Sequence, residues 1–394
     1  MSLDPLFPSF FIGGFECSTH RLASGVRLDM VAATGHDRHV VADFERLRAH
    51  GIRTAREGIR WHLIEPTPGR FDFSGALAIL RAARDAGIQV IWDLLHYGWP
   101  DDVDIWGPAF VDRFARLARE FAGVLADEWP GVAWLAPVNE VSFLAWMGGE
   151  VARINPFGRS RGAELKDQLV RASIAAIREV REVLPSARFA QIEPIFHVIP
   201  HPDRPAEAGP AEAYRLAQYE VWDKLSGRLS PDLGGRPEYL DVLGVNYYPW
   251  NQWIFEGPTS EGTGIGPAHP GYRPFREMLL ENSERYGRPL FVAETGTEGD
   301  ARAGWLGHVG GEVRAAIRGG ADVAGLCLYP ILNFPGWDNG RDCQNGLWDR
   351  ADEDGNRPIH RPLADELERQ RRLFSRERRR TPGRGSLAGA GTGP

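Results

Sequence analysis

Two glutamates that end apolar segments are the residues of this sequence best placed to do chemistry. Glu140 ends WLAPVNE, residues 134–140, and Glu294 ends PLFVAE, residues 289–294. A carboxyl group is costly to desolvate, so its place at the end of a buried strand needs a structural or a catalytic reason. Two such carboxyls that meet in one site can cleave a glycosidic bond. One protonates the leaving oxygen and the other attacks the anomeric carbon.

Further polar and aromatic residues follow other apolar segments, and we expect them to surround the two carboxyls as substrate-binding residues. They are Arg56, His96, Asn139, Asn246, Tyr248, Trp99, Tyr329 and Trp337. Each also has a structural interpretation: Arg56 could neutralise Glu57, and the tryptophans could be loop core. We interpret Glu16, Glu193 and Glu298 as helix caps or surface residues, the commoner role of a single Glu after a strand.

Eight short apolar segments alternate with eight helical patterns, and this alternation predicts the fold. The expected strands are near-continuous apolar runs, typical of parallel strands covered on both faces. They lie at 9–15, 52–58, 88–95, 132–138, 187–193, 239–246, 289–294 and 323–329. The expected helices lie at 39–51, 73–87, 109–129, 165–184, 210–225, 273–286, 308–319 and 361–374. Ser74 is a candidate N-cap, and Gly51 and Gly87 are candidate C-terminal glycines.

This pattern favours an α/β protein with a single (β/α)8 TIM barrel over residues 1–374. A doubly wound sheet would need a Gly-rich first turn, and FIGGFECSTH, residues 11–20, has only one pair of glycines. In a barrel the C-terminal ends of all strands meet at one mouth. The polar residues above would therefore converge there. Residues 375–394 are basic, then Gly-rich, and we expect a disordered tail.

Composition argues against several other classes of protein. The net charge of −7 and the absence of a basic imbalance within the body argue against a nucleic-acid partner, and no apolar run suggests a membrane span. No signal peptide is recognisable, and three scattered cysteines fit a reduced cytoplasm. His36/His39 and His197/His201 lack the setting of a metal site, so we expect neither metal nor cofactor. The sequence does not determine the oligomeric state.

Five motifs, taken together, resemble the retaining β-glycosidases of glycoside hydrolase family 1. AREGIRWHLIEPTPGRFDF, residues 55–73, is similar to the segment of that family that carries Arg and Trp, and LLHYGWP, residues 94–100, resembles its His-Trp-Asp-Leu-Pro. APVNEVS resembles its Thr-x-Asn-Glu-Pro, DVLGVNYYP its Asn-Tyr-Tyr, and FVAETGT its Ile-Thr-Glu-Asn-Gly. The resemblance covers about residues 10–350.

The resemblance implies a role for each matching residue. Glu140 would be the acid/base, Glu294 the nucleophile, and Asn139 the residue that holds the sugar 2-hydroxyl. His96 would lie in the sugar-binding site, and Tyr248 would hydrogen-bond the nucleophile. Burial and the charge of Glu294 should raise the pKa of Glu140. The implied activity is hydrolysis of a β-glucoside or β-galactoside, and the partner is a carbohydrate or glycoside.

Two departures from the family leave the sugar open. The first strand of the family delivers a Gln, whereas GGFECSTHR here places His20-Arg21 near that position; after the eighth strand, YPILNFPGW lacks the Glu that grips the outer sugar hydroxyls. Two alternatives therefore stay open. The same site could serve a transglycosidase, or the chain could be a sugar-binding barrel that has lost turnover.

Overall fold

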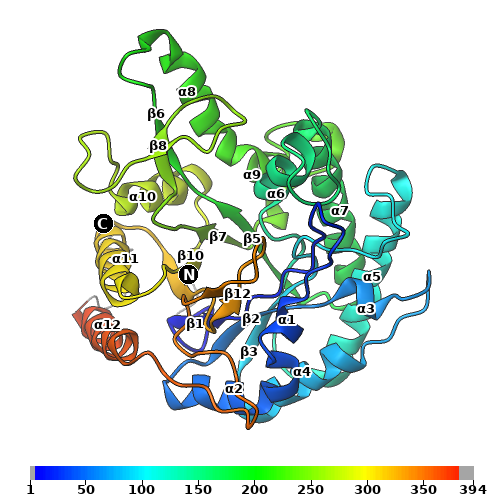
Figure 1. Ribbon diagram of the computed structural model, residues 1–394. Helices are drawn as coiled ribbons and strands as arrows, with labels where there is room; N and C mark the ends of the chain where they lie inside the picture. Colours follow the sequence, from blue (N-terminus) through cyan, green and yellow to red (C-terminus); the bar gives the residue numbers. More distant parts are fainter. Residues whose placement is uncertain (1–4, 381–394) are drawn as a thin grey trace, which may run out of the picture.

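The computed structural model describes residues 5–380 and confirms the (β/α)8 barrel. All eight predicted strands are present and form a closed, parallel sheet in the order β1-β11-β10-β7-β5-β4-β3-β2, in which β2 pairs with β1 (Figure 1). The barrel strands are β1 (Phe11–Gly14), β2 (Thr54–Gly58), β3 (Gln89–Asp93), β4 (Trp134–Ala136), β5 (Arg188–Pro194), β7 (Val242–Asn246), β10 (Leu290–Thr295) and β11 (Val323–Leu328).

Helices surround the barrel, and each predicted helical segment is helical in the structure. The larger ones are α2 (His36–Ala49), α4 (Ser74–Ala86), α5 (Pro108–Glu128), α7 (Gly162–Val183), α8 (Ala208–Leu216), α9 (Glu220–Leu225), α10 (Phe275–Tyr286), α11 (Ala301–Arg318) and α12 (Arg361–Arg380). Short helices are α1 (Met30–Ala33), α3 (Trp61–Ile64), α6 (Val141–Leu144), the π-helix η1 (Ala145–Glu150) and four 3₁₀ turns, η2 (Pro205–Glu207), η3 (Ala217–Tyr219), η4 (Pro231–Leu233) and η5 (Pro237–Tyr239).

Two helix ends test the predicted caps. Gly87 ends α4 in the left-handed conformation, with φ of 65°, as its role as a C-terminal glycine requires. Ser74 is not the N-cap. It is the first residue of α4, and its backbone N–H donates to Oδ1 of Asp72 at 2.9 Å, so the nearby aspartate satisfies this amide.

Two packed cores hold the barrel together. Inside it, alternate residues of the strands, such as Ile91, Phe291 and Ala293, pack together, and Phe7 packs against Trp134 at 5.2 Å between ring centroids. Between the strands and the helices lies the larger core, which includes Ala55, Trp92 and Val292. Successive residues of a strand point to opposite sides, so most strands contribute to both cores, whereas β2 places the charged Arg56 on the inner side.

The C-terminal helix extends past the point where we expected a tail. α12 continues to Arg380, so residues 375–380 are helical, and residues 381–394 lie outside the described residues. Phe374 stacks on Phe10 at 4.2 Å between ring centroids, and Glu377 pairs with Arg318 of α11. Contacts with distant parts of the chain therefore fix a segment whose composition alone suggested disorder.

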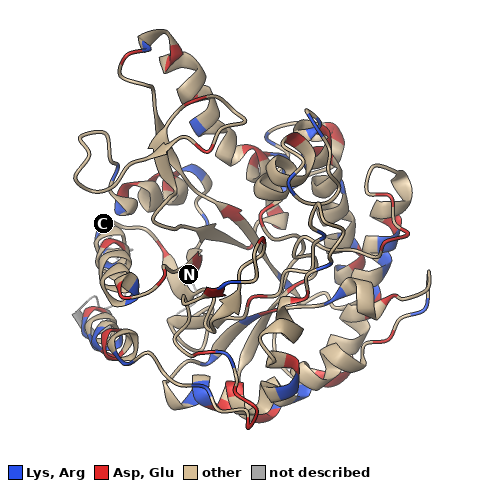
Figure 2. Cartoon of the chain, in the orientation of Figure 1, with Lys and Arg blue, Asp and Glu red and all other residues tan. Residues whose placement is uncertain are grey.

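Five further strands of the described part of the chain lie outside the barrel sheet, in segments that follow the C-terminal ends of barrel strands. β6 (His197–Ile199), β8 (Gln252–Ile254) and β9 (Thr263–Gly264) form a small sheet that projects from the ring of helices together with α8, at the top of Figure 1. β12 (Phe334–Pro335) and β13 (Asp342–Cys343) form a hairpin after β11. Acidic and basic residues are mixed over the outer helices (Figure 2). Within residues 5–380, no helix has the length and apolar character to cross a membrane.

Candidate active site

The predicted acid, Glu140, stands at the turn from β4 into α6. It has a left-handed backbone, with φ of 47° and ψ of 63°, which is unfavourable for a residue with a Cβ. Hydrogen bonds hold this turn in place, because the N–H of Glu140 donates to the carbonyl of Ile192 at 3.0 Å and the N–H of Asn139 to that of Leu95 at 3.0 Å. Strained backbone of this kind concentrates at functional sites.

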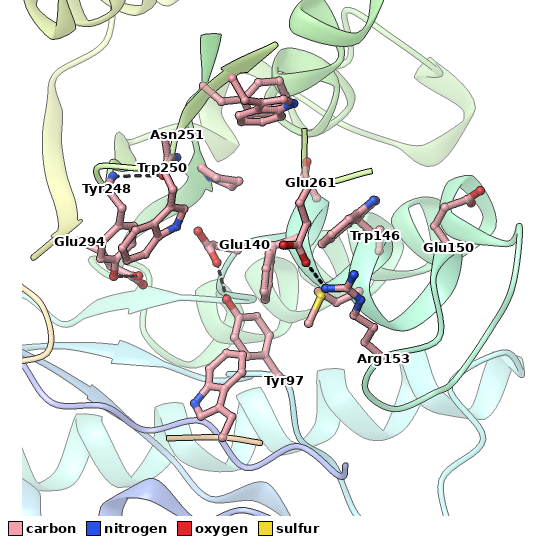
Figure 3. Close-up of a pocket in the computed structure, with 18 of the residues that line it drawn as sticks. Tyr97, Glu140, Trp146, Glu150, Arg153, Tyr248, Trp250, Asn251, Glu261 and Glu294 are labelled. Atoms are coloured by element: carbon pink, nitrogen blue, oxygen red, sulfur yellow. Dashed lines mark hydrogen bonds and ion pairs between the residues drawn. The ribbon is translucent and has the colours of Figure 1, made fainter. Parts of the chain in front are cut away.

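The carboxyl of Glu140 has a hydrogen-bond donor at each oxygen. Nδ2 of Asn246 donates to Oε1 at 2.9 Å. The hydroxyl of Tyr97 donates to Oε2, as Figure 3 shows. The residue is only 8% exposed. Burial, and next the charge of Glu294, raise the pKa of Glu140 to about 8. The group can therefore hold a proton at neutral pH.

Glu294, the other carboxyl, lies in a different setting. Nη1 of Arg56 donates to Oε1 at 2.9 Å, and the hydroxyl of Tyr248 donates to Oε2 at 2.8 Å. A guanidinium and a hydroxyl donor both favour the charged form of a carboxyl. The two glutamates thus share one pocket in contrasting environments, one paired with a cation and the other bound by neutral donors.

Arg56 joins the nucleophile candidate to the rest of the barrel mouth. Its Nη2 donates to Oδ2 of Asp93 at 2.6 Å and to Oδ1 of Asn139 at 3.0 Å. Arg56 does not pair with Glu57, which binds His36 instead. The alternative that Arg56 only neutralises Glu57 is therefore wrong. The guanidinium is fully buried behind the pocket wall and binds the carboxylates of Asp93 and Glu294 from there.

The amide of Asn139 is bonded at both ends. Its oxygen accepts from Arg56, and its Nδ2 lies 3.2 Å from Nε2 of His96 and 3.0 Å from the hydroxyl of Tyr97. His96 is oriented in turn by Asp93, whose Oδ2 lies 3.1 Å from its Nδ1. Asn139 and Asn246 are both fully buried behind the pocket wall. A contact between Asn139 and a sugar 2-hydroxyl therefore stays a prediction.

One group of side chains among the described residues has the spacing of a metal site. Ligand atoms of Cys17, Asp93 and His96 lie within 4.8 Å of one another, and all three residues are buried. Oδ2 of Asp93 already accepts from Arg56, however, and burial raises the pKa of the Cys17 thiol to about 11. A cation beside the carboxylate and a protonated thiol fit a hydrogen-bonded cluster better than a metal centre.

The pocket above these groups has a volume of about 900 Å³ and holds several of the predicted residues. Glu140, Glu294, His96, Tyr248, Tyr329 and Trp337 line it. Trp250 also lines it, is 60% exposed and stacks on Tyr248 at 5.0 Å between ring centroids. Trp99 is not among the lining residues. It is buried in the core and packs edge-on against Phe110 of α5 at 6.1 Å.

The sequence interpretation missed several residues of the pocket, among them Tyr97 and Glu16. Tyr97 contacts both Glu140 and Asn139, and its position beside His96 was the available signal. Glu16 is not a surface residue, because it is buried at the pocket, where one carboxyl oxygen accepts from the N–H of Ser18 at 3.1 Å. His20 is buried beside Trp337, Arg21 pairs with Asp101, and neither residue lines the pocket.

The other two glutamates have the structural roles expected of them. Glu193 is buried, and its Oε2 accepts from the N–H of Ser142 at 3.0 Å, so it caps the first turn of α6 from the end of β5. Glu298 lies at the outer part of the pocket and pairs with Arg341 at 2.5 Å.

Comparison with known proteins adds information on the fold. No protein-family model and no curated protein matches the sequence. Solved structures do match: a family 1 β-glucosidase from Thermotoga maritima has a TM-score of 0.74 at 16% identity, covering 93% of this chain and 98% of its own. The fold is that of family 1 β-glucosidases. The resemblance stated from the sequence is thereby confirmed at the level of the fold.

Two further structures agree. A β-glucosidase from Thermotoga maritima in complex with deoxynojirimycin has a TM-score of 0.73 at 16% identity and covers 93% of this chain and 98% of its own. A hyperthermophilic β-glucosidase mutant, described as forming a dodecamer in the crystal, has a TM-score of 0.72 at 17% identity, over 92% of this chain and all of its own. The likeness runs along nearly the whole barrel.

Proposed function

We propose that this protein is a retaining β-glycosidase that hydrolyses a β-glycosidic bond by double displacement. Glu294 is the nucleophile and Glu140 the acid/base. The observation that carries the proposal is the contrast between these two carboxyls in one pocket. Arg56 and Tyr248 stabilise a negative charge on Glu294, whereas burial and the charge of Glu294 keep Glu140 protonated.

In the first step, the Glu294 carboxylate attacks the anomeric carbon and forms an ester to the sugar. The bond from that carbon to the leaving oxygen breaks, and Glu140 gives its proton to this oxygen. Glu294 is then neutral, so it no longer raises the pKa of Glu140, and Glu140 is left as a carboxylate. That carboxylate is the base that the second step needs.

In the second step, a water molecule attacks the anomeric carbon from the face that the aglycone has left. Glu140 takes a proton from this water, the ester bond breaks, and Glu294 leaves as a carboxylate. Two inversions at one carbon return the β configuration. Arg56 and Tyr248 then stabilise the restored charge on Glu294, to which both donate hydrogen bonds. A carbohydrate or glycoside is therefore the partner we propose, and no step requires a cofactor.

The proposal is tested with a panel of 2-deoxy-2-fluoro β-glycosides that carry activated leaving groups. Intact mass and peptide mapping should find a covalent sugar on Glu294, and the sugar that labels fastest would identify the glycone. Glu298 offers a matched control because it lines the same pocket but is paired with Arg341. Glu298→Gln should label like the wild type, and Glu294→Gln should not label. An adduct on another residue, or unchanged turnover in Glu294→Gln, would contradict the proposal.

A further inference from the structure

The acid/base carboxyl marks the side of the pocket from which the leaving group departs, because it must reach the leaving oxygen. In Figure 3, Glu140 lies between Glu294 on one side and Trp146, Arg153 and Glu261 on the other. α6 and η1 follow Glu140 directly along the chain and form this second side. We call this part of the pocket the aglycone arm, with the lining residues Phe143, Trp146, Met147, Phe196, Tyr214 and Trp253.

One wall of the arm is a cluster of aromatic rings. Phe196 lies 5.1 Å from Trp253 and 5.6 Å from Tyr214 between ring centroids. Trp253 belongs to β8 and Tyr214 to α8, so the small projecting sheet and its helix hold these rings together. A second wall comes from η1 and the helix before it, with Trp146 and Met147 half-buried at the pocket surface. Both walls therefore offer flat or flexible apolar surfaces to a ligand.

Charged side chains that line the arm are already bound to one another. Nζ of Lys166 lies 2.7 Å from Oε2 of Glu220, and Arg153 pairs with Glu261. Glu150 is bound to the backbone instead, since its Oε2 accepts from the N–H of Gly162 at 3.1 Å.

The amide of Gln218, another lining residue, is also engaged at both ends. Its oxygen accepts from the N–H of Phe196 at 3.0 Å, and its Nε2 donates to the carbonyl of Arg215 at 2.6 Å. A second sugar would need free partners for its hydroxyls, because a polar group that is buried without one loses free energy. Aromatic faces, by contrast, are available as they stand.

Residues of the segment 256–262 also line the arm, and we call this segment its cover. Nε1 of Trp146 donates to the carbonyl of Pro258 at 3.0 Å, and the Arg153–Glu261 ion pair joins the residues after η1 to the same segment. These two contacts hold the cover against the wall that carries Trp146 (Figure 3). An apolar group placed beneath it would be removed from water, which is the main source of binding free energy for such a group.

We infer that the aglycone arm binds an apolar aromatic alcohol as the leaving group, in preference to a second sugar. This inference rests on the proposed function and adds the class of aglycone to it. The volume of about 900 Å³ leaves room for a sugar and a large aglycone together. Trp253 and Trp146 on the two walls are the specificity-determining residues.

The test compares glycosides of the sugar that labels fastest, with leaving alcohols of similar acidity. Differences in kcat/KM then report how the aglycone binds and not how readily it departs. The methyl β-glycoside, the 2-phenylethyl β-glycoside and a β-linked disaccharide provide this series. We expect kcat/KM for the phenylethyl glycoside to exceed that for the disaccharide at least about tenfold. Trp253→Ala and Trp146→Ala should remove most of this preference, because kcat/KM should fall further for the phenylethyl glycoside than for the disaccharide.

Trp129 offers a matched control, because it is half-buried at the C-terminal end of α5 and does not line the pocket. Trp129→Ala should keep the preference. If Trp253→Ala does not fold, Trp253→Leu keeps an apolar side chain without the ring and should give the same loss. Better cleavage of the disaccharide, or an unchanged preference in the Trp253 and Trp146 variants, would overturn the inference alone. Failure to cleave any glycoside would instead overturn the proposed function.

Discussion

Arg56 and Glu57 are consecutive residues of β2, both fully buried, and they serve opposite faces of the strand. Arg56 pairs in register with Ile91, a residue of the barrel interior, and binds Asp93 and Glu294. Glu57 points toward the helices, where its Oε1 lies 2.9 Å from Nε2 of His36. Alternation along a strand separates the two charges by one residue and gives them different partners.

The network around Glu57 is closed within the protein. Nδ1 of His36 lies 2.8 Å from Asp43, which also binds Arg357 at 2.7 Å. Burial opposes a charge on His36, but Glu57 and Asp43 outweigh it and raise the pKa of the imidazole to about 9. None of these residues lines the pocket. The Arg56 network, in contrast, reaches the pocket through Glu294. We therefore expect changes in the Arg56 network to affect activity and changes in the Glu57 network to affect stability.

The largest effect should come from Arg56→Lys. A single ammonium cannot reproduce the fork that binds Asp93 and Glu294 together. We expect kcat/KM to fall by about 10²–10³-fold, as when one preorganised donor is removed from an active site. Glu57→Gln is the matched change on the other face and should leave kcat/KM close to the wild-type value. Equal losses of activity in both variants would show that the two networks do not have separate roles.

Stability should respond in the opposite way. Glu57→Gln removes one charge from a closed buried network, and we expect the free energy of unfolding to fall by about 3 kcal/mol. Urea denaturation at pH 7 measures it. His36 can release its proton in this variant, which places the expected loss at the lower end of the range for broken buried pairs. A variant that keeps its stability but loses activity would show that Glu57 acts on the site.

The pH dependence of activity should depend on the groups that face the pocket and not on the network around Glu57. Glu140 has to be protonated in the first step, so kcat/KM should fall as pH rises through about 8, where burial and the charge of Glu294 place its pKa. A pH–rate profile of the wild type checks this limb. Glu57→Gln should show the same limb, because the closed network does not contact Glu140. A profile that is flat to pH 9.5 would contradict the assignment of Glu140.

The smallest change should come from Tyr97→Phe. The Tyr97 hydroxyl donates to Glu140 and thereby stabilises its charged form. Its removal should raise the pKa of Glu140, move the basic limb to higher pH and lower kcat/KM about tenfold at most. A limb that moves to lower pH would show that the sign of this interaction is wrong.

The sequence predicts the barrel and the two carboxyls because both depend on local patterns. Apolar runs of strand length alternate with helical periodicity, and Glu140 and Glu294 come where their runs end. The barrel topology then brings these ends together. The helix that Glu193 caps could not be predicted in this way, because Glu193 ends β5 but binds α6, which follows β4 and lies 51 residues earlier in the chain.

The residues that the sequence analysis missed or predicted wrongly owe their positions to loop geometry and to contacts between distant parts of the chain. Tyr97 reaches Glu140 because both have left-handed backbones, with φ of 67° and 47°. No sequence pattern marks a Tyr or Glu for that conformation. Trp99 follows the turn at Tyr97 into the core against α5, although its place after β3 suggested the pocket. α12 extends past residue 375 because Phe374 packs on Phe10 and Phe11, more than 360 positions away.

The anomeric form of the first sugar released tests the central claim most directly. Proton NMR, started within minutes of adding enzyme to the best β-glycoside of the panel, distinguishes the two anomers before mutarotation mixes them. Double displacement through Glu294 predicts that the β-anomer appears first and the α-anomer only later. First release of the α-anomer would show a single displacement by water, and would contradict the assignment of Glu294 as nucleophile.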